Sequence, residues 1–213
     1  MSRLFAAVEI YMSTQKLEKK SKENKNSLTY TVQNIVVKST LNTTSDIDLI
    51  KIVKRVKNTE YDKARFPGLF FRISDPKCVV IIFRTGKMVL TGIKEFIHIK
   101  KIVDLIVKEL NKTVKANIKR DMVDSEIVNI VATANFDNKI DLDLSAITLN
   151  NVIFEPEVFP GLIFKCVQPV KCVFLIFNSG NVVLTGIREE KGIEPALIDL
   201  GRLMRKKNLF LTE

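Results

Sequence analysis

The chain contains one sequence pattern twice. Residues 66–72 read Phe-Pro-Gly-Leu-Phe-Phe-Arg and residues 159–165 read Phe-Pro-Gly-Leu-Ile-Phe-Lys, while Val-Leu-Thr-Gly-Ile occurs at 89–93 and again at 183–187. Across residues 66–93, 17 of 28 aligned positions are identical in the second copy, which has one additional residue, Val170. A spacing of more than ninety residues exceeds the unit length of solenoid repeats. The pattern therefore predicts two similar half-domains related by pseudo-twofold symmetry.

The duplication divides the 213 residues into three parts. Residues 1–27 form a lysine-rich tail, expected to be a flexible arm with nuclear import or contact with a DNA backbone as alternatives. Residues 28–120 form the first repeat and residues 121–213 the second. The apolar runs are far too short for a membrane span, and the run Leu4–Val8 is too short for a signal peptide. We expect no membrane association.

The composition disfavours enzymes. The chain has a single histidine, His98, which we expect to be solvent-exposed on a lysine-rich helix, and no phosphate-binding glycine loop, nucleophile elbow or metal-ligand cluster. We therefore expect no catalytic residue, metal or cofactor. The three cysteines lack ligand spacing, and buried thiols in a reducing compartment are the simplest interpretation. The net charge of +10 favours a polyanion or an acidic partner surface.

Each repeat shows the order strand, helix, three strands, helix. In the first repeat, alternation and turn signals predict strands at 30–40, 68–74, 77–84 and 87–93, and apolar spacing predicts helices at 47–57, with Ser45 as N-cap, and at 96–111. In the second, strands are expected at 126–136 and in three segments ending at 187, and helices at 142–149 and 194–208. The paired carboxylates Asp46/Asp48 and Asp141/Asp143 are expected to stabilise helix N-termini. This order predicts an α+β two-layer protein.

The central strands are apolar on both faces, as in residues 78–83 and 172–177. An antiparallel sheet covered by helices on one side normally alternates apolar and polar residues. Two helices per repeat can cover only one face, so the pattern predicts an exposed apolar face that a partner covers. The alternatives are a second layer of structure or a dimer interface.

Several motifs resemble the TATA-box-binding protein family. They are Gln33-Asn-Ile-Val36, the two Phe-Pro-Gly-Leu segments, Thr85-Gly-Lys87, Val89-Leu-Thr-Gly92 and, most strongly, Phe154-Glu-Pro-Glu-Val-Phe-Pro-Gly-Leu162. The resemblance covers residue 30 to the C-terminus, with both repeats in register. It implies a saddle: one curved antiparallel sheet with helices on the convex face and the DNA minor groove on the concave face. Members of this family are a standard example of minor-groove proteins that insert apolar side chains between base steps.

The resemblance also implies roles for individual residues. Four phenylalanine rings, expected to be exposed, would intercalate: Phe66, Phe83, Phe159 and Phe177. The floor of the minor-groove site would consist of Asn34, Val36, Ile81, Val89, Thr91, Asn129, Val131, Leu175, Val183 and Thr185. Phosphates would be held by Arg72, Lys77, Lys87, Lys94, Lys165, Lys171 and Arg188. An acidic loop would contact transcription factor IIB through Glu155, Glu157 and Val158.

Three positions depart from the family pattern. Asn181 stands where the first repeat has Lys87, Val170 lengthens the turn at Pro169, and Lys38 lies on the face expected to meet DNA. We expect the phosphate contact at Asn181 to be weaker than the one at Lys87. The longer turn at Val170 makes Lys171 a less direct match to the family's phosphate contact. We expect Lys38 to reach a phosphate.

The resemblance implies a general transcription factor in the nucleus, or in the cytoplasm if the chain is archaeal. The partners it implies are double-stranded A·T-rich DNA, transcription factor IIB, other initiation factors and the RNA polymerase machinery, with self-association possible in the absence of DNA. The rival function is a hydrophobic-ligand-binding module that uses the apolar sheet. That function explains the apolar face but leaves the asparagines, threonines and basic rim without a role.

Overall fold

The computed structural model describes residues 29–43, 45–114 and 117–211, which divide into two compact units. The amino-terminal unit comprises residues 34–128, and the carboxy-terminal unit comprises residues 129–211 together with 29–33. The expected tail, residues 1–27, lies outside the described residues. In the part of the chain that the structure describes, no helix is both long and apolar enough to span a membrane.

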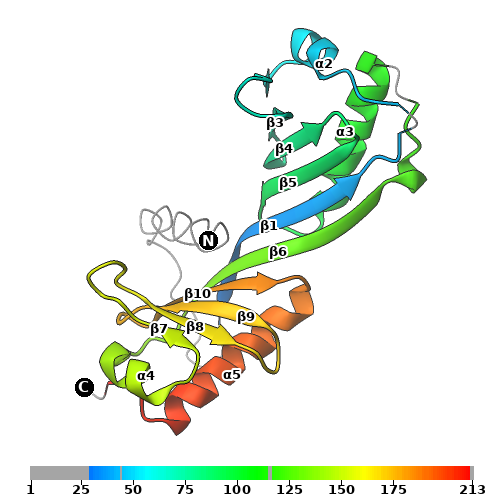
Figure 1. Cartoon of the computed structure of the whole chain (residues 1–213). Coiled ribbons are helices and arrows are strands. Elements are labelled where there is room, and N and C mark those ends of the chain that lie inside the picture. The colour runs from blue at the N-terminus through cyan, green and yellow to red at the C-terminus, as the bar shows by residue number, and fades with distance from the viewer. Residues whose placement is uncertain (1–28, 44, 115–116, 212–213) are drawn as a thin grey trace. The chain divides into compact units, whose positions relative to one another are not determined.

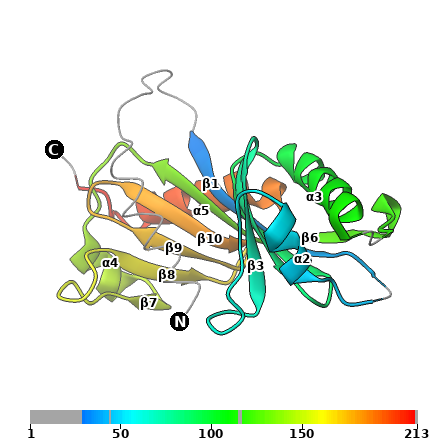
Figure 2. The same ribbon diagram turned by 90° about the horizontal axis from the view of Figure 1, so that it is seen from above.

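The amino-terminal unit contains five antiparallel strands in the order β2-β3-β4-β5-β1. Their bounds are β1 Tyr30–Thr40, β2 Thr59–Glu60, β3 Gly68–Ser74, β4 Lys77–Phe83 and β5 Lys87–Ile93. The first four residues of β1 belong to the carboxy-terminal unit. Helices α2 (Leu49–Arg55) and α3 (His98–Val114) pack against each other (Figures 1 and 2). A short 3-10 turn, η1 (Arg120–Met122), precedes the second repeat.

The carboxy-terminal unit repeats this arrangement with the strand order β6-β10-β9-β8-β7. The strands are β6 Asp124–Asn135, β7 Val152–Ile153, β8 Leu162–Cys166, β9 Cys172–Ile176 and β10 Asn181–Ile187. The helical elements are α4 Leu142–Thr148, η2 Glu190–Gly192 and α5 Ile193–Lys206. Figure 1 shows α5 running alongside the strands of this unit. Both units are α+β, as predicted.

Local sequence signals placed most of these elements correctly. The three strands expected after Phe66 are found within one residue of their predicted ends. The expected N-cap at Ser45 is wrong: Asp48 caps α2 by accepting a hydrogen bond from the Lys51 amide at 2.9 Å. Asp141 caps α4 in the same way, through the Leu144 amide at 2.8 Å. The two-residue strands β2 and β7 were not predicted, because two residues are too short to show alternation.

The core of the amino-terminal unit lies between its sheet and α3. Ile102, Val103, Ile106, Val107 and Leu110 of α3 are buried, at the helical spacing expected of an amphipathic helix. The strands contribute every second residue to this core, including Val80, Ile82 and Leu90, each 0% exposed. The alternate residues of β4 and β5 therefore point to the other face of the sheet.

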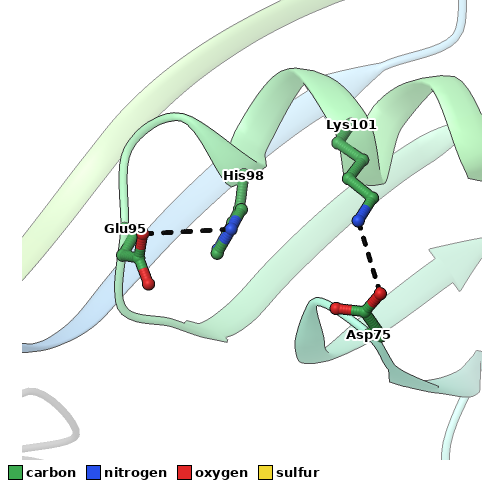
Figure 3. A network of polar contacts seen from close by, with 4 residues as sticks. All are labelled: Asp75, Glu95, His98 and Lys101. Atoms are coloured by element: carbon green, nitrogen blue, oxygen red, sulfur yellow. Dashed lines mark hydrogen bonds and ion pairs between the residues drawn. The ribbon is translucent and has the colours of Figure 1, made fainter.

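Polar contacts at the start of α3 hold it to the sheet (Figure 3). Lys101 forms an ion pair with Asp75 of the β3–β4 turn, with an Nζ–Oδ2 distance of 3.4 Å (Figure 3). His98 Nε2 lies 3.9 Å from Glu95 Oε2, and the histidine side chain is 33% exposed (Figure 3). His98 is therefore half-buried rather than fully solvated, and its described ion-pair partner is a local carboxylate.

Candidate nucleic-acid interface

The sheet face that the helices do not cover differs between the two units. In the amino-terminal unit, Val36, Val79, Ile81 and Val89 are half-buried, whereas their strand neighbours are buried; Thr91 is half-buried as well. This alternation shows that one face of apolar strands is core and the other is partly accessible. The expected apolar face is therefore present in this unit.

The same face is buried in the carboxy-terminal unit, so the expectation of exposure is wrong there. Val131, Leu175, Phe177 and Val183 form a cluster with Ile163, and each is 0–7% exposed. Phe159 and Val173 pack against this cluster and are partly buried. Thr185, on the same face, is 5% exposed.

A backbone irregularity in each unit positions an asparagine on this face. Gly92 has a φ of 82°, and the register of β1 with β5 shifts between Ile35 and Val37. Gly186 has a φ of 92°, and the register of β10 with β6 shifts beside it. Glycine adopts this left-handed conformation without steric cost, so the repeated Thr-Gly supplies a bulge in each unit.

Each bulge amide binds an asparagine side chain. Gly92 N donates to Asn34 Oδ1 at 2.7 Å, and Asn34 Nδ2 lies 3.3 Å from Thr91 Oγ1. The carboxy-terminal unit repeats the geometry: Gly186 N donates to Asn129 Oδ1 at 2.8 Å, and Asn129 Nδ2 lies 3.3 Å from Thr185 Oγ1.

This arrangement sets the polarity of each asparagine. Because a backbone N–H can only donate, the atom facing it must be the amide oxygen. The Nδ2 group is thereby turned toward the threonine. It carries two N–H donors, so one can bond to the threonine hydroxyl and the other can bond to a further acceptor. Each unit thus presents an oriented donor beside apolar side chains.

The phenylalanine pairs lie around the glycine of Phe-Pro-Gly-Leu. The ring centroids of Phe66 and Phe83 are 5.9 Å apart, and those of Phe159 and Phe177 are 5.7 Å apart. Phe66 is 37% exposed, whereas Phe177 is 4% exposed. The expectation that all four rings are exposed is therefore wrong for Phe177, which is a member of the apolar cluster.

The glycine between each pair is a functional position that sequence reasoning missed. A Cβ on Gly161 would lie 2.8 Å from Phe159 Cε1 and 2.9 Å from Phe177 Cε1, and a Cβ on Gly68 would meet Phe66 and Ile81 equally closely. Glycine is therefore required to let the rings approach the backbone. The repetition of Phe-Pro-Gly-Leu in both copies was the available signal.

The seven candidate phosphate contacts are all exposed: Arg72, Lys77, Lys87, Lys94, Lys165, Lys171 and Arg188. Arg72 is also paired with Glu60, with an Nη2–Oε2 distance of 3.5 Å. Lys38 is exposed on the same parity of β1 as Asn34 and Val36. Asn181, in place of a cation, accepts a hydrogen bond from Asn135 Nδ2 at 2.6 Å.

The loop before each Phe-Pro-Gly-Leu has the same backbone fold but opposite charge. The amides of Val158 and Phe159 both donate to Glu155 O at 2.9 Å, and the amides of Arg65 and Phe66 donate to Asp62 O at 3.1 and 3.0 Å. Glu155 and Glu157 are exposed, and Val158 is 80% exposed. The carboxy-terminal loop therefore presents two carboxylates and an accessible apolar side chain.

These features define a duplicated α+β protein in which each unit has an oriented asparagine donor beside apolar side chains and carries exposed cations on its strands and loops. The family model described as "Transcription factor TFIID (or TATA-binding protein, TBP)" matches residues 29–113 and 124–207. A TATA-box-binding protein of Picrophilus torridus is 40% identical over 183 residues, which cover 84% of this chain and 96% of the relative. The chain belongs to the TATA-binding protein family.

Other relatives and a solved structure agree. A TATA-box-binding protein of Sulfolobus acidocaldarius is 41% identical over 166 residues, which cover 78% of this chain and 82% of the relative. The structure of the Methanococcus jannaschii TBP matches with a TM-score of 0.70 and 33% identity, covering 83% of this chain and 98% of the other. The predicted fold class is confirmed, and the family is one of transcription factors rather than enzymes.

Proposed function

We propose that this protein is a transcription factor that binds TATA-type, A·T-rich DNA through the minor groove. The observation that carries the proposal is the oriented asparagine in each unit, which turns a donor toward an otherwise apolar face. The minor groove of A·T pairs presents acceptors only, whereas a G·C pair adds an amino donor. Asparagine donors in an apolar floor match the acceptors of A·T pairs. They do not match the amino donor that a G·C pair adds.

The phenylalanine pairs give this site a means of bending DNA. Apolar wedges that enter base steps unstack them at a cost of a few kcal/mol per step, which a larger contact area offsets. Phe66 and Phe159, the rings nearest the exposed loops, are the first to meet a base step. Phe83 and Phe177 support them from the adjacent strand, and Phe177 must leave its apolar neighbours to intercalate.

The exposed cations supply affinity without sequence information. Lysine and arginine bind phosphates, and their positions fix how the protein sits on the duplex. Self-association without DNA would cover the same apolar face. We propose that this surface is primarily a DNA surface because exposed cations accompany the asparagine donors in both units.

The acidic loop is the proposed contact for transcription factor IIB. Glu155, Glu157 and Val158 are exposed in the carboxy-terminal unit, whereas the equivalent loop of the other repeat, residues 61–65, carries Lys63 and Arg65 beside a single carboxylate, Asp62. Through this contact the protein would nucleate a preinitiation complex with other initiation factors and RNA polymerase. The named relatives are archaeal, which favours the cytoplasmic alternative over the predicted nuclear location.

The function is tested by Asn129→Asp. Aspartate keeps the size of the side chain and accepts the Gly186 amide, but it replaces the donor with a negative charge that faces the groove acceptors. We expect the affinity for an A·T-rich duplex to fall at least tenfold, with thermal stability unchanged.

The matched control is Asn150→Asp, which makes the same change at an exposed position between α4 and β7. Affinity measured by fluorescence anisotropy should be unaffected by this control. Equal binding of wild type to A·T-rich and G·C-only duplexes, or an undiminished affinity of Asn129→Asp, contradicts the proposed function.

A further inference from the structure

Two cysteines face each other at the turn end of the β8–β9 hairpin. Cys166, the last residue of β8, is the direct cross-strand partner of Cys172, the first residue of β9. Neither forms a disulfide; Cys172 is buried and Cys166 is half-buried. The five residues between them form the turn that contains Pro169 and Val170.

The strand pairing places the two thiols within bonding reach. Residues directly opposite each other in an antiparallel ladder have Cα atoms about 4.5 or 5.5 Å apart, and their side chains share one face of the sheet. Disulfides span Cα separations of roughly 4.4–6.8 Å, so the backbone need not move to accommodate the bond.

The side chains are in contact as well. The pKa of Cys172 is raised to about 12, first by burial and also by the charge of Cys166 and a hydrogen bond with its side chain. Cys166 Sγ also donates to Gln168 O at 2.9 Å. Both residues line a hollow together with Val167, Val170 and Lys191, which gives a small oxidant access to the half-buried thiol.

The first repeat provides an internal comparison. Cys78 is the counterpart of Cys172, but its cross-strand partner is Ile73, the counterpart of Cys166. Burial raises the pKa of Cys78 to about 11, and it is 3% exposed. The same hairpin position thus carries a thiol pair in one repeat and a single thiol in the other.

We propose that Cys166 and Cys172 form a reversible intrachain disulfide, which makes the β8–β9 hairpin a redox-modification site. With hydrogen peroxide as oxidant, the Cys166 thiolate attacks one oxygen and becomes a sulfenic acid, and hydroxide leaves. The Cys172 sulfur then attacks the Cys166 sulfur, its proton passes to the departing oxygen, and water is released. A small-molecule dithiol restores both thiols and is itself oxidised to a disulfide.

The bond would join the two sides of a hairpin that carries two of the exposed cations, Lys165 in β8 and Lys171 in the turn. Lys165 precedes Cys166 and Lys171 precedes Cys172, so the cross-link holds both lysines on one closed hairpin. The disulfide forms within this hairpin whether or not the protein binds DNA.

Trypsin provides a direct readout. Cleavage after Lys165, Lys171 and Arg188 separates residues 166–171 from residues 172–188, and a disulfide keeps these two peptides joined. The full chain is treated with excess peroxide, remaining thiols are blocked with N-ethylmaleimide, and the digest is analysed by mass spectrometry. We expect the joined peptide to form, to disappear after dithiothreitol, and to be absent in Cys166→Ser, while Cys78 is still blocked by maleimide.

The variant Ile73→Cys extends the test to the first repeat. It creates the same cross-strand pair with Cys78, and trypsin cleavage after Arg72, Lys77 and Arg84 should then give a joined pair of peptides 73–77 and 78–84. Over-oxidation of Cys166 without the joined peptide, cross-links between separate chains, or equal oxidation of Cys78 in the wild type would each overturn the inference.

Discussion

A Cβ on Gly161 would approach two phenylalanine rings within 2.9 Å, closer than real Cβ contacts allow. The rings of Phe159 and Phe177 would have to shift, because they are the movable groups at this point. A single methyl group therefore tests whether ring position matters for DNA distortion without changing any charge.

We expect Gly161→Ala to reduce the DNA bend and to weaken binding about tenfold, with the fold retained, because the displaced rings no longer match a base step. The bend is measured by fluorescence resonance energy transfer between the ends of a labelled duplex. Gly192→Ala is the control, since its added Cβ meets only ordinary contacts at 3.5 Å or more. A normal bend with Gly161→Ala would show that the rings are not wedges.

The repeat-equivalent rings Phe83 and Phe177 are predicted to differ in their effect on stability. Phe177 is 4% exposed within the apolar cluster, whereas Phe83 is half-buried. We expect Phe177→Ala to lower the free energy of unfolding by about 3–5 kcal/mol, as for buried phenylalanines, and Phe83→Ala to lower it by less. Urea unfolding of the two variants measures the difference. Equal losses would contradict the predicted difference between the two rings.

At the scale of elements, the two loops before Phe-Pro-Gly-Leu share a turn but differ in charge. In both, two successive amides donate to one carbonyl, that of Asp62 or Glu155. Because these hydrogen bonds join backbone atoms, the side chains of the loop can differ while the turn is kept. The difference in charge makes the two repeats unequal. Such an inequality is needed if a nearly symmetric DNA site is to be read in one direction.

We expect the double variant Glu155→Arg and Glu157→Arg to bind DNA as well as wild type or slightly more tightly, but to lose the ternary complex with transcription factor IIB. Both carboxylates are exposed, so their reversal repels a basic partner without leaving a buried charge. Gel-shift titration with and without the factor separates the two effects. Normal ternary complex formation would place the docking surface elsewhere.

At the scale of the whole molecule, we expect the exposed cations of the two repeats to determine how DNA binding depends on salt. If all seven candidate residues held phosphates, the slope of log affinity against log salt concentration would be about −6. We expect Lys165→Ala to make this slope less steep by about 0.9 for every duplex sequence. Anisotropy titrations over a range of potassium chloride concentrations provide the slope. An unchanged slope for Lys165→Ala would remove that residue from the phosphate contacts.

The sequence by itself determined the features that depend on neighbours along the chain. The duplication, the strands at 68–74 and 77–83 and the amphipathic α3 follow from periodicity and from glycine and proline positions, which act locally. The asparagines and threonines of the candidate site were also identified from the sequence, through the motifs that resemble the TATA-box-binding protein family.

Only the tertiary structure decided which groups meet. Apolar residues on both faces of a strand do not indicate which face is covered, so the half-buried Phe83 and the buried Phe177 could not be distinguished from sequence. The pairing of Cys166 with Cys172, and of Cys78 with Ile73, likewise depends on strand register. Register and burial arise from contacts between segments distant along the chain, and a local pattern carries no information about those contacts.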